Sequence, residues 1–172
     1  FVATLSDYLS LLLTGRRVCD AGTASLLGLL DVRRCDWWPP ALGALNLEPD
    51  SLAHPVLPGS AVGPVCEDGA DLIGLSTGTL LCAGTLDHYA AALGAGLGTI
   101  AHVSDSTGTV LACIRERPGW HPAPGLCAGP GFAPDHSCSM AFDANGAAVL
   151  EWYRRAHAPG CDFKVLDAEA AL

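Results

Sequence analysis

The sequence predicts an α/β fold that spans two domains. Short apolar runs bounded by glycines, which are typical of buried strands, alternate with segments that carry helix start and stop signals. The chain has 172 residues, of which half are hydrophobic and only 16% are charged, so it can bury a real core. Gly94, Gly96 and Gly98 interrupt the pattern, and they place the expected domain boundary between residues 1–96 and 97–172.

The first helix is predicted over residues 4–14. Thr4 and Asp7 have the spacing of a capping box, an apolar stretch follows them, and Gly15 supplies the end signal. A second helix is expected at about 37–45, because prolines are tolerated in the first turn of a helix.

The rest of the first domain leads to an aspartate at the start of a helix. The proline- and glycine-rich residues 49–64 predict a connecting loop, and a short helix at 67–75 follows. Residues 80–84 form a short apolar run that predicts a buried strand. The next helix is expected at about 88–95, with Asp87 as its cap.

The second domain is expected to open with a β-hairpin. Its strands are predicted at 99–105 and 109–115, on either side of a turn at 106–108. Residues 117–137, which are rich in proline and glycine, predict a long loop. A short strand at 139–142 and a helix at 146–157 complete the prediction.

Charge and hydropathy exclude several classes of function. The chain carries 9 basic and 18 acidic residues, and a net charge of −9 argues against binding to nucleic acid or to an anionic membrane. The least polar region, 78–103, contains Asp87, His88 and His102, so no membrane-spanning helix is expected. No signal peptide is visible at the N-terminus, and we expect a cytoplasmic protein. A nucleotide ligand remains compatible with this negative charge, because backbone amides and Mg²⁺ can hold phosphates.

The eight cysteines are predicted to be free thiols. They show no Cys-x-x-Cys pair, their spacing is irregular, and several lie in apolar runs, which is typical of buried thiols in a cytosolic protein. No Cys/His pair has the spacing of a zinc site.

Residue 1 is Phe and the single methionine is Met140, so we expect the chain to be a piece of a longer protein.

Asp87 is the first candidate for chemistry. A carboxylate at the mouth of a helix meets free amides and the positive end of the helix dipole, which suits the ionised form that a general base requires. The alternative is that Asp87 only caps the helix. His88 is placed either to contact a substrate hydroxyl or simply to cover the first turn.

The sequence Ser106-Thr-Gly-Thr109 is the second candidate. Gly108 permits a positive φ that would let backbone amides converge on an anion, and the threonine hydroxyls add donors. The alternative is an ordinary hairpin turn. Gly108 follows Asp87 by 21 positions, so one helix and one strand separate them and the turn can return to face the carboxylate. A base beside a phosphate-binding turn is the arrangement that phosphoryl transfer needs.

A second phosphate-loop motif is interpreted as fortuitous. Asp20-Ala-Gly-Thr-Ala-Ser25 matches the D-x-G-T-x-S loop of actin-like ATPases. That motif should join two strands, and the residues before Asp20 contain no convincing strand. We therefore expect a plain loop here.

Together these segments resemble the FGGY family of carbohydrate kinases. Residues 7–38, DYLSLLLTGRRVCDAGTASLLGLLDVRRCDWW, resemble the family patterns DYL-x-x-x-LTG, TD-x-x-x-AS and D-x-x-x-x-x-W in that order. TLLCAGTLDH at 79–88 resembles the strand that leads to the catalytic aspartate, which is commonly AG-x-x-D-Q. DSTGTVL at 105–111 resembles the turn that binds ADP phosphates, and Gly146 resembles a helix glycine near the nucleotide.

The resemblance implies an RNase H-like (actin-like ATPase) fold, in which two domains close over a cleft. It also implies ATP-dependent phosphorylation of a small-molecule sugar or polyol, with Mg²⁺ near Asp87 bridging phosphate oxygens. Asp87 would deprotonate the sugar hydroxyl, and His88 would contact the substrate where many relatives carry Gln. The implied nucleotide-binding residues are Thr107, Gly108, Thr109 and Gly146.

The resemblance also shows which parts the chain lacks. The family's first phosphate loop, its N-terminal sugar-binding residues and its late adenosine-binding glycines have no counterpart here. We therefore expect a fragment of a cytosolic sugar kinase that is inactive alone, and a homodimer of the full-length protein is allowed. Two alternatives stay open: a diverged, non-catalytic relative that serves as a binding or interaction protein, and a secreted module framed by disulfides.

Overall fold

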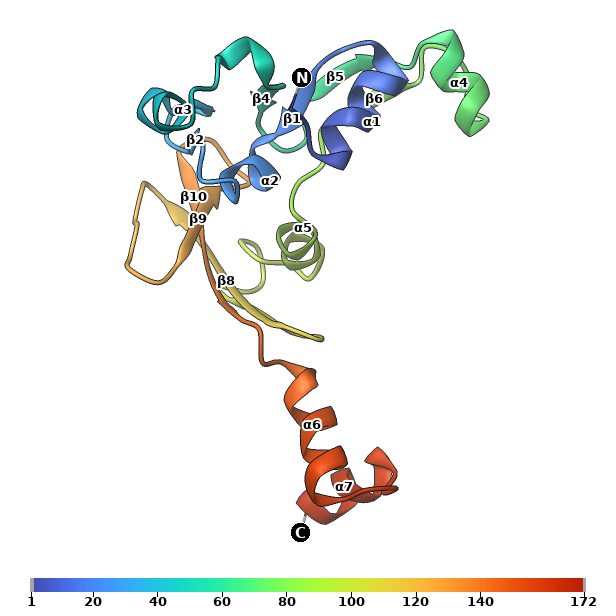
Figure 1. The fold of residues 1–172 in the computed structure, drawn as a ribbon, viewed down its shortest axis with the longest axis vertical. Coiled ribbons are helices and arrows are strands. Elements are labelled where there is room, and N and C mark those ends of the chain that lie inside the picture. Colours follow the sequence, from blue (N-terminus) through green and yellow to red (C-terminus); the bar gives the residue numbers. More distant parts are fainter. Residues whose placement is uncertain (1, 172) are drawn as a thin grey trace.

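The computed structural model describes residues 2–171 as three parts that follow one another along a single long axis (Figure 1). An N-terminal α/β part is followed by a four-stranded sheet covered by one helix, and two helices extend beyond the sheet. The mixed α/β class predicted from the sequence is confirmed. Within residues 2–171 the structure contains no helix that combines the length and the apolar character needed to cross a membrane.

Helix α1 (Leu5–Thr14) begins at the predicted capping box. The Thr4 hydroxyl accepts a hydrogen bond from the Asp7 amide at 3.4 Å, and the Asp7 carboxylate accepts one from the Thr4 amide at 2.8 Å. Two amides that the helix itself leaves unpaired are thereby satisfied. Gly15 ends the helix in the left-handed conformation, as predicted.

The N-terminal part contains several short elements around a core that includes Trp37. They are β1 (Val18–Asp20), α2 (Ala21–Ser25), β2 (Leu30–Asp31), β3 (Asp36–Trp37), α3 (Pro39–Leu45), η1 (Pro49–Ser51), β4 (His54–Val56), β5 (Ala61–Pro64), α4 (Glu67–Ile73) and β6 (Leu80–Cys82). β1 pairs in parallel with β4, and β2 pairs antiparallel with β3. The buried Trp37 indole donates a hydrogen bond to the Ala53 carbonyl at 3.0 Å. The helices predicted at 37–45 and 67–75 are confirmed with slightly shorter bounds.

Two predictions for this part were wrong. The stretch 49–64, predicted as a loop, contains β4 and β5, whose partners are distant in sequence and leave no local signal. The strand predicted over 80–84 ends at Cys82 and is not buried, since Leu80 is 58% exposed. Within residues 2–171 β6 has only β5 as a neighbouring strand, so much of its apolar surface stays open.

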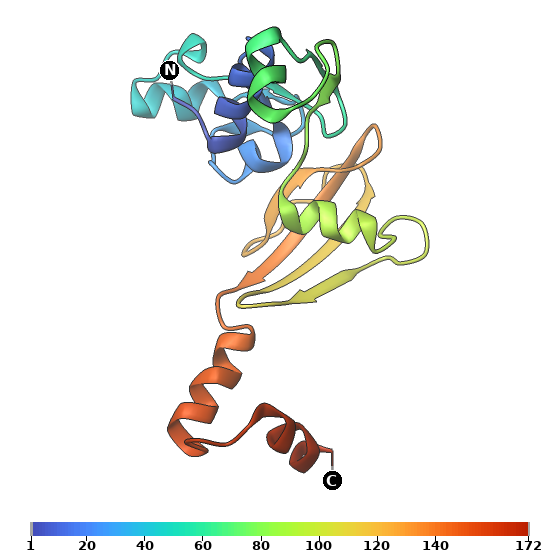
Figure 2. The ribbon, with the colours of Figure 1, turned by 90° about the vertical axis from the view of Figure 1, so that its right-hand side faces the viewer.

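The middle part is an antiparallel sheet with the strand order β7-β8-β10-β9. The strands are β7 (Ser104–Thr107), β8 (Leu111–Pro118), β9 (Cys127–Pro130) and β10 (His136–Asp143). Helix α5 (Asp87–Gly94) lies across one face of this sheet (Figure 2). Tyr89 of α5 is fully buried and shares a core with Ile114 and Cys138 of the strands. This packing joins α5 to the sheet. The predicted boundary at residues 96–97 would instead assign α5 to the first domain, and it stays a prediction.

The predicted hairpin is confirmed, with a shift along the chain. β7 begins at Ser104 rather than at residue 99 and continues through Thr107, so the turn covers 108–110 instead of 106–108. The long loop predicted over 117–137 was wrong, because β8 continues to Pro118, β9 lies inside the stretch, and β10 begins at its end. β9 is an edge strand, where a proline costs no ladder hydrogen bond, so the proline content misled the prediction.

The C-terminal part consists of α6 (Ala147–His157) and α7 (Phe163–Ala170), which project away from the sheet (Figure 2). The helix predicted at 146–157 is confirmed, with Gly146 as its N-cap. The Arg154 guanidinium pairs with Glu151 at 2.9 Å and lies 4.6 Å from the centre of the Phe163 ring. The contact between Arg154 and Phe163 links α6 to α7, and neither helix has a buried residue.

Candidate active site

Asp87 is exposed at the first position of α5. The prediction that it caps this helix was wrong, because Leu86 occupies the N-cap position. The Oδ1 atom of Asp87 accepts a hydrogen bond from the His88 amide at 2.7 Å. Its Oδ2 atom has no hydrogen-bond partner within residues 2–171, so this oxygen is available to a ligand at the positive end of the helix dipole.

His88 connects the start of α5 to strand β7. Its Nδ1 atom lies 3.2 Å from the Ser106 hydroxyl, and both residues are half-buried. One of the two atoms donates the hydrogen bond, and the other ring nitrogen, Nε2, remains free for a further partner. The chain therefore returns beside the Asp87 segment at Ser106, and the predicted approach of the turn itself to the carboxylate stays a prediction.

The hairpin turn has an open side at Gly108. The Gly108 amide donates a hydrogen bond to the Val110 carbonyl at 2.9 Å, and Thr107 and Thr109 are exposed. The prediction of a positive φ at Gly108 was wrong, because Gly108 is not among the glycines whose φ is positive. No heavy atom lies within 4 Å of the position where a Cβ would stand, so the space above this glycine is open.

Gly146 packs directly against the same turn. The Ala147 amide donates a hydrogen bond to the Gly108 carbonyl at 2.7 Å. A Cβ on Gly146 would stand 2.5 Å from the carbonyl carbon of Val110 and 2.7 Å from the Gly108 oxygen. Since these are backbone atoms that cannot move aside, the contact requires glycine. The structure thus brings together Gly146 and the turn, which the resemblance assigned to one nucleotide site.

The Asp20–Ser25 segment, interpreted from the sequence as a fortuitous match, packs against the residues that lead to Asp87. Strand β1 does precede it, contrary to the prediction, but helix α2 follows, so it is not the strand-turn-strand of a phosphate loop. The buried Asp20 caps α2 by accepting a hydrogen bond from the Thr23 amide at 2.7 Å. Gly22 is in close contact with Thr85, and a Cβ there would stand 3.2 Å from the Leu86 nitrogen. The segment thus contacts the two residues that precede Asp87.

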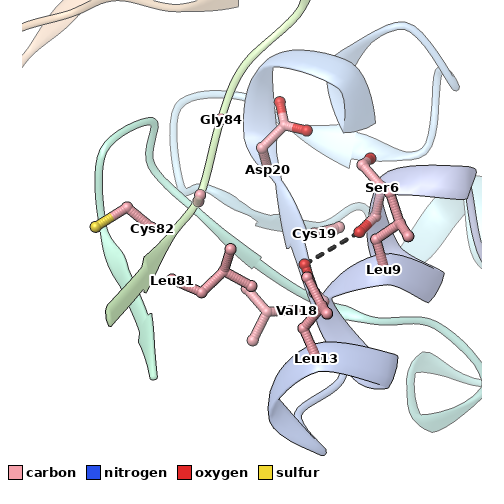
Figure 3. A pocket seen from close by; sticks show the side chains of 11 residues that line it. Ser6, Leu9, Leu13, Val18, Cys19, Asp20, Leu81, Cys82 and Gly84 are labelled. Carbon is pink, nitrogen blue, oxygen red and sulfur yellow. Dashed lines mark hydrogen bonds between the residues drawn. The ribbon is translucent and has the colours of Figure 1, made fainter. Parts of the chain in front are cut away.

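A pocket of about 210 Å³ lies between α1, β1 and β6 (Figure 3). Leu9, Leu13, Val18 and Leu81 form much of its wall, and Asp20 and Gly84 lie toward one end. Neither Asp87 nor His88 lines it. A polyol needs many hydrogen-bonding groups, so these apolar walls do not suit a sugar.

The cysteines are free thiols, but only Cys19 and Cys138 are buried, so the prediction of buried thiols was wrong for the others. All eight cysteines are free, as predicted. Burial raises the pKa of the Cys19 thiol and of the Cys138 thiol to about 12, which keeps both protonated and unreactive. Residues 2–171 contain no group of three or more His, Cys, Asp or Glu side chains arranged to hold a metal ion.

Comparison with known proteins decides the family. Residues 1–94 match the family model for the N-terminal domain of the FGGY family of carbohydrate kinases. This chain belongs to the FGGY family. It is 34% identical to the xylulose kinase of Streptomyces coelicolor, over 93% of this chain and 34% of that protein. It is 33% identical to the autoinducer-2 kinase of Escherichia coli K12, over 56% of this chain and 18% of that protein.

Solved structures of FGGY kinases share the fold. The xylulose kinase from Rhodospirillum rubrum aligns with a TM-score of 0.84 and 28% identity, over 96% of this chain and 34% of that one. A kinase from Brucella ovis aligns with a TM-score of 0.82 and 26% identity, over 95% and 34% of the two chains. The RNase H-like fold predicted for this FGGY member is therefore confirmed. The chain spans about a third of the length of these relatives.

Proposed function

We propose that this chain is part of an ATP-dependent carbohydrate kinase, which transfers the γ-phosphate of ATP to a hydroxyl of a sugar or polyol. One observation carries the proposal beyond family membership. The contact between His88 and Ser106 holds the start of α5 beside the strand that leads into the hairpin turn. A carboxylate for the acceptor hydroxyl and a turn for the phosphates are thereby held on one rigid unit.

Asp87 acts as the general base. Its unpartnered Oδ2 atom takes the proton of the acceptor hydroxyl while the hydroxyl oxygen attacks the γ-phosphorus. The bond between the γ-phosphorus and the oxygen that joins it to the β-phosphate breaks, and this oxygen leaves as part of ADP. His88 orients the sugar through Nε2, while Nδ1 stays with Ser106. The imidazole occupies a position where many relatives carry Gln, so it offers one ring nitrogen in place of a side-chain amide.

The nucleotide phosphates bind at the hairpin turn. The open space above Gly108 lets phosphate oxygens approach the backbone, and the exposed hydroxyls of Thr107 and Thr109 supply donors. Gly146 allows the start of α6 to approach the turn closely, which brings further backbone amides to the same place.

The residues present also fit the use of ATP with Mg²⁺. Mg²⁺ in kinases is held mainly by phosphate oxygens and water. The ion would be bound as Mg-ATP near the exposed Asp87, whose role toward it is indirect because its free oxygen serves as the base. When bound, the ion neutralises negative charge that develops on the phosphates. This agrees with the lack of a complete metal-binding cluster in residues 2–171.

The family relatives guide the choice of acceptor. Xylulose kinases are among the matches that extend over nearly the whole chain, so a ketose is the first class to test. We place the enzyme in the cytoplasm, with the catalytic cleft at the boundary between residues 1–96 and 97–172, and a homodimer is compatible with this proposal.

The test is ADP release by the full-length gene product with ATP, Mg²⁺ and a panel of pentuloses, hexuloses and polyols. We expect one class of sugar to stimulate ADP release well above the rate without sugar. If ATP binds and no sugar stimulates its turnover, the protein is a non-catalytic FGGY relative, and the proposal is wrong.

A further inference from the structure

A second and larger pocket lies at the opposite end of the sheet from the hairpin turn. It encloses about 520 Å³ between the turn that joins β2 to β3 and the residues that join β9 to β10. Its walls include Arg33 and Arg34 from the N-terminal part, and Trp120, Asp135 and His136 from the sheet. β8 runs from Leu111 at the turn to Pro118 near this pocket, a length of roughly 25 Å at the usual rise per residue. The pocket is therefore separate from the candidate active site.

A buried carboxylate orients the histidine of this pocket. The Glu116 side chain is only 7% exposed, and its Oε1 atom accepts hydrogen bonds from the Phe132 amide at 2.8 Å and from His136 Nδ1 at 3.1 Å. Because a carboxylate can only accept here, the proton on Nδ1 is assigned. The Nε2 atom of His136 has no partner within the described chain, and the half-buried ring lines the pocket.

Two adjacent arginines line the pocket from the N-terminal part. The backbone amides of Arg33 and Arg34 donate to the Asp31 carboxylate at 3.1 and 3.3 Å, which fixes the turn that carries them. Neither guanidinium forms an ion pair within residues 2–171. These two unpaired guanidinium groups give one wall of the pocket positive charge in a chain whose net charge is −9. The exposed carboxylate of Asp135 also lines the pocket, and its negative charge partly offsets the positive charge of the arginines.

We propose that this pocket binds a small phosphorylated molecule. A phosphate monoester carries about two negative charges, and guanidinium groups match its oxygens with paired N–H donors. His136 supplies a third polar contact through Nε2, and the Trp120 indole offers a flat apolar surface to the carbon skeleton. The ligand contacts both the N-terminal part and the sheet, and it links the two.

The test is calorimetric titration of the full-length gene product with ribose 5-phosphate and, separately, with inorganic phosphate. Saturating ADP is present throughout, so that a nucleotide site is filled. Ribose 5-phosphate should bind, and inorganic phosphate should bind more weakly because it cannot reach Trp120. Replacing both arginines, Arg33→Ala with Arg34→Ala, should weaken ribose 5-phosphate binding by about tenfold or more.

A matched control is Arg115→Ala, an exposed arginine on β8 outside the pocket, which should keep the wild-type affinity. Arg33 and Arg34 are exposed, so their replacement should leave the melting temperature unchanged. Wild-type affinity in the double variant, or equal affinity for inorganic phosphate and ribose 5-phosphate, would overturn the proposal. The measurement requires no turnover, and the double arginine variant separates this pocket from the active site, which is expected to bind a sugar phosphate as its product: binding that survives the double replacement belongs to the active site and overturns the proposal.

Discussion

The imidazole of His88 and the hydroxyl of Ser106 lie 3.2 Å apart although 18 positions separate them in the sequence. This contact spans the glycine-rich segment that follows α5, and it attaches the first turn of the helix to β7. Asp87 precedes His88, and Thr107 follows Ser106. A single hydrogen bond therefore connects the two segments on which the proposed chemistry depends.

Ser106→Ala removes that hydrogen bond and frees the His88 ring. In the full-length enzyme we expect KM for the sugar to rise by about three- to tenfold, since the loss of one hydrogen bond to a neutral group costs about 1 kcal/mol. KM for ATP should stay within about twofold. Steady-state kinetics with each substrate varied in turn measures both values. Ser104→Ala on the same strand is the matched control, and an equal effect of the two changes would argue against a role for this contact.

Gly108→Val and Gly146→Val separate binding from folding. At Gly108 the new side chain enters open space, so the melting temperature should hold while ADP affinity falls. At Gly146 the side chain meets the backbone of Val110, and we expect a loss of about 1–3 kcal/mol in the free energy of unfolding. Urea unfolding and ADP titration of both variants provide the measurements. Unchanged ADP affinity in Gly108→Val would remove the turn from the nucleotide site.

The thiols should divide into reactive and protected groups. With a thiol reagent at pH 8, the exposed Cys82 and Cys127 should react first, whereas Cys19 and Cys138 should react only after unfolding. Burial raises the pKa of the two buried thiols from 9.0 to about 12, so the folded state binds more protons between these values. Their stabilising effect is therefore complete below pH 9 and declines as pH rises toward 12. Fewer than eight titratable thiols in the denatured, unreduced protein would contradict the free-thiol assignment.

Tyr89 should tolerate loss of its hydroxyl but not of its ring. The ring is fully buried, and it packs edge-on against Phe132 with centroids 6.5 Å apart. The hydroxyl has no hydrogen-bond partner within the described residues, so Tyr89→Phe should leave stability unchanged or raise it by about 1 kcal/mol. Tyr89→Ala should cost about 3–5 kcal/mol because it empties the core. Chemical denaturation compares the two variants, and a large loss in Tyr89→Phe would reveal a missing partner.

The elements that the sequence predicts well are those with local signals. The capping box at Thr4, the end of α1 at Gly15 and the β-hairpin all follow from residues near one another. The strands that were missed have two different causes. β4 pairs with β1, which lies 36 positions earlier in the chain, whereas β9 pairs locally with β10 but lies at the edge of the sheet. A proline-rich stretch at an edge strand has the same composition as a loop, so sequence alone cannot separate them.

The candidate site shows the same division. The spacing between Asp87 and Gly108 predicts a return of the chain to α5, which the contact between His88 and Ser106 confirms for strand β7 but not for the turn itself. The cap at Leu86 and the backbone of Gly108 differ from prediction, because each depends on where an element ends, and element ends are poorly specified by local sequence. The contact between Gly22 and Thr85 has no local signal, since it joins two segments 63 positions apart. A role for Asp20–Ser25 was visible only in the family pattern TD-x-x-x-AS.

Asp87→Asn in the full-length enzyme is the most direct measurement. The substitution keeps the size of the side chain and removes the base, so sugar-dependent turnover should fall by about 10²–10⁴-fold. ADP affinity should stay within about threefold. Asp68→Asn, which alters an exposed aspartate in the first turn of α4, is the matched control and should leave turnover unchanged. Equal losses of turnover and ADP affinity in Asp87→Asn, or turnover close to wild type, would contradict the assignment of Asp87 as the base.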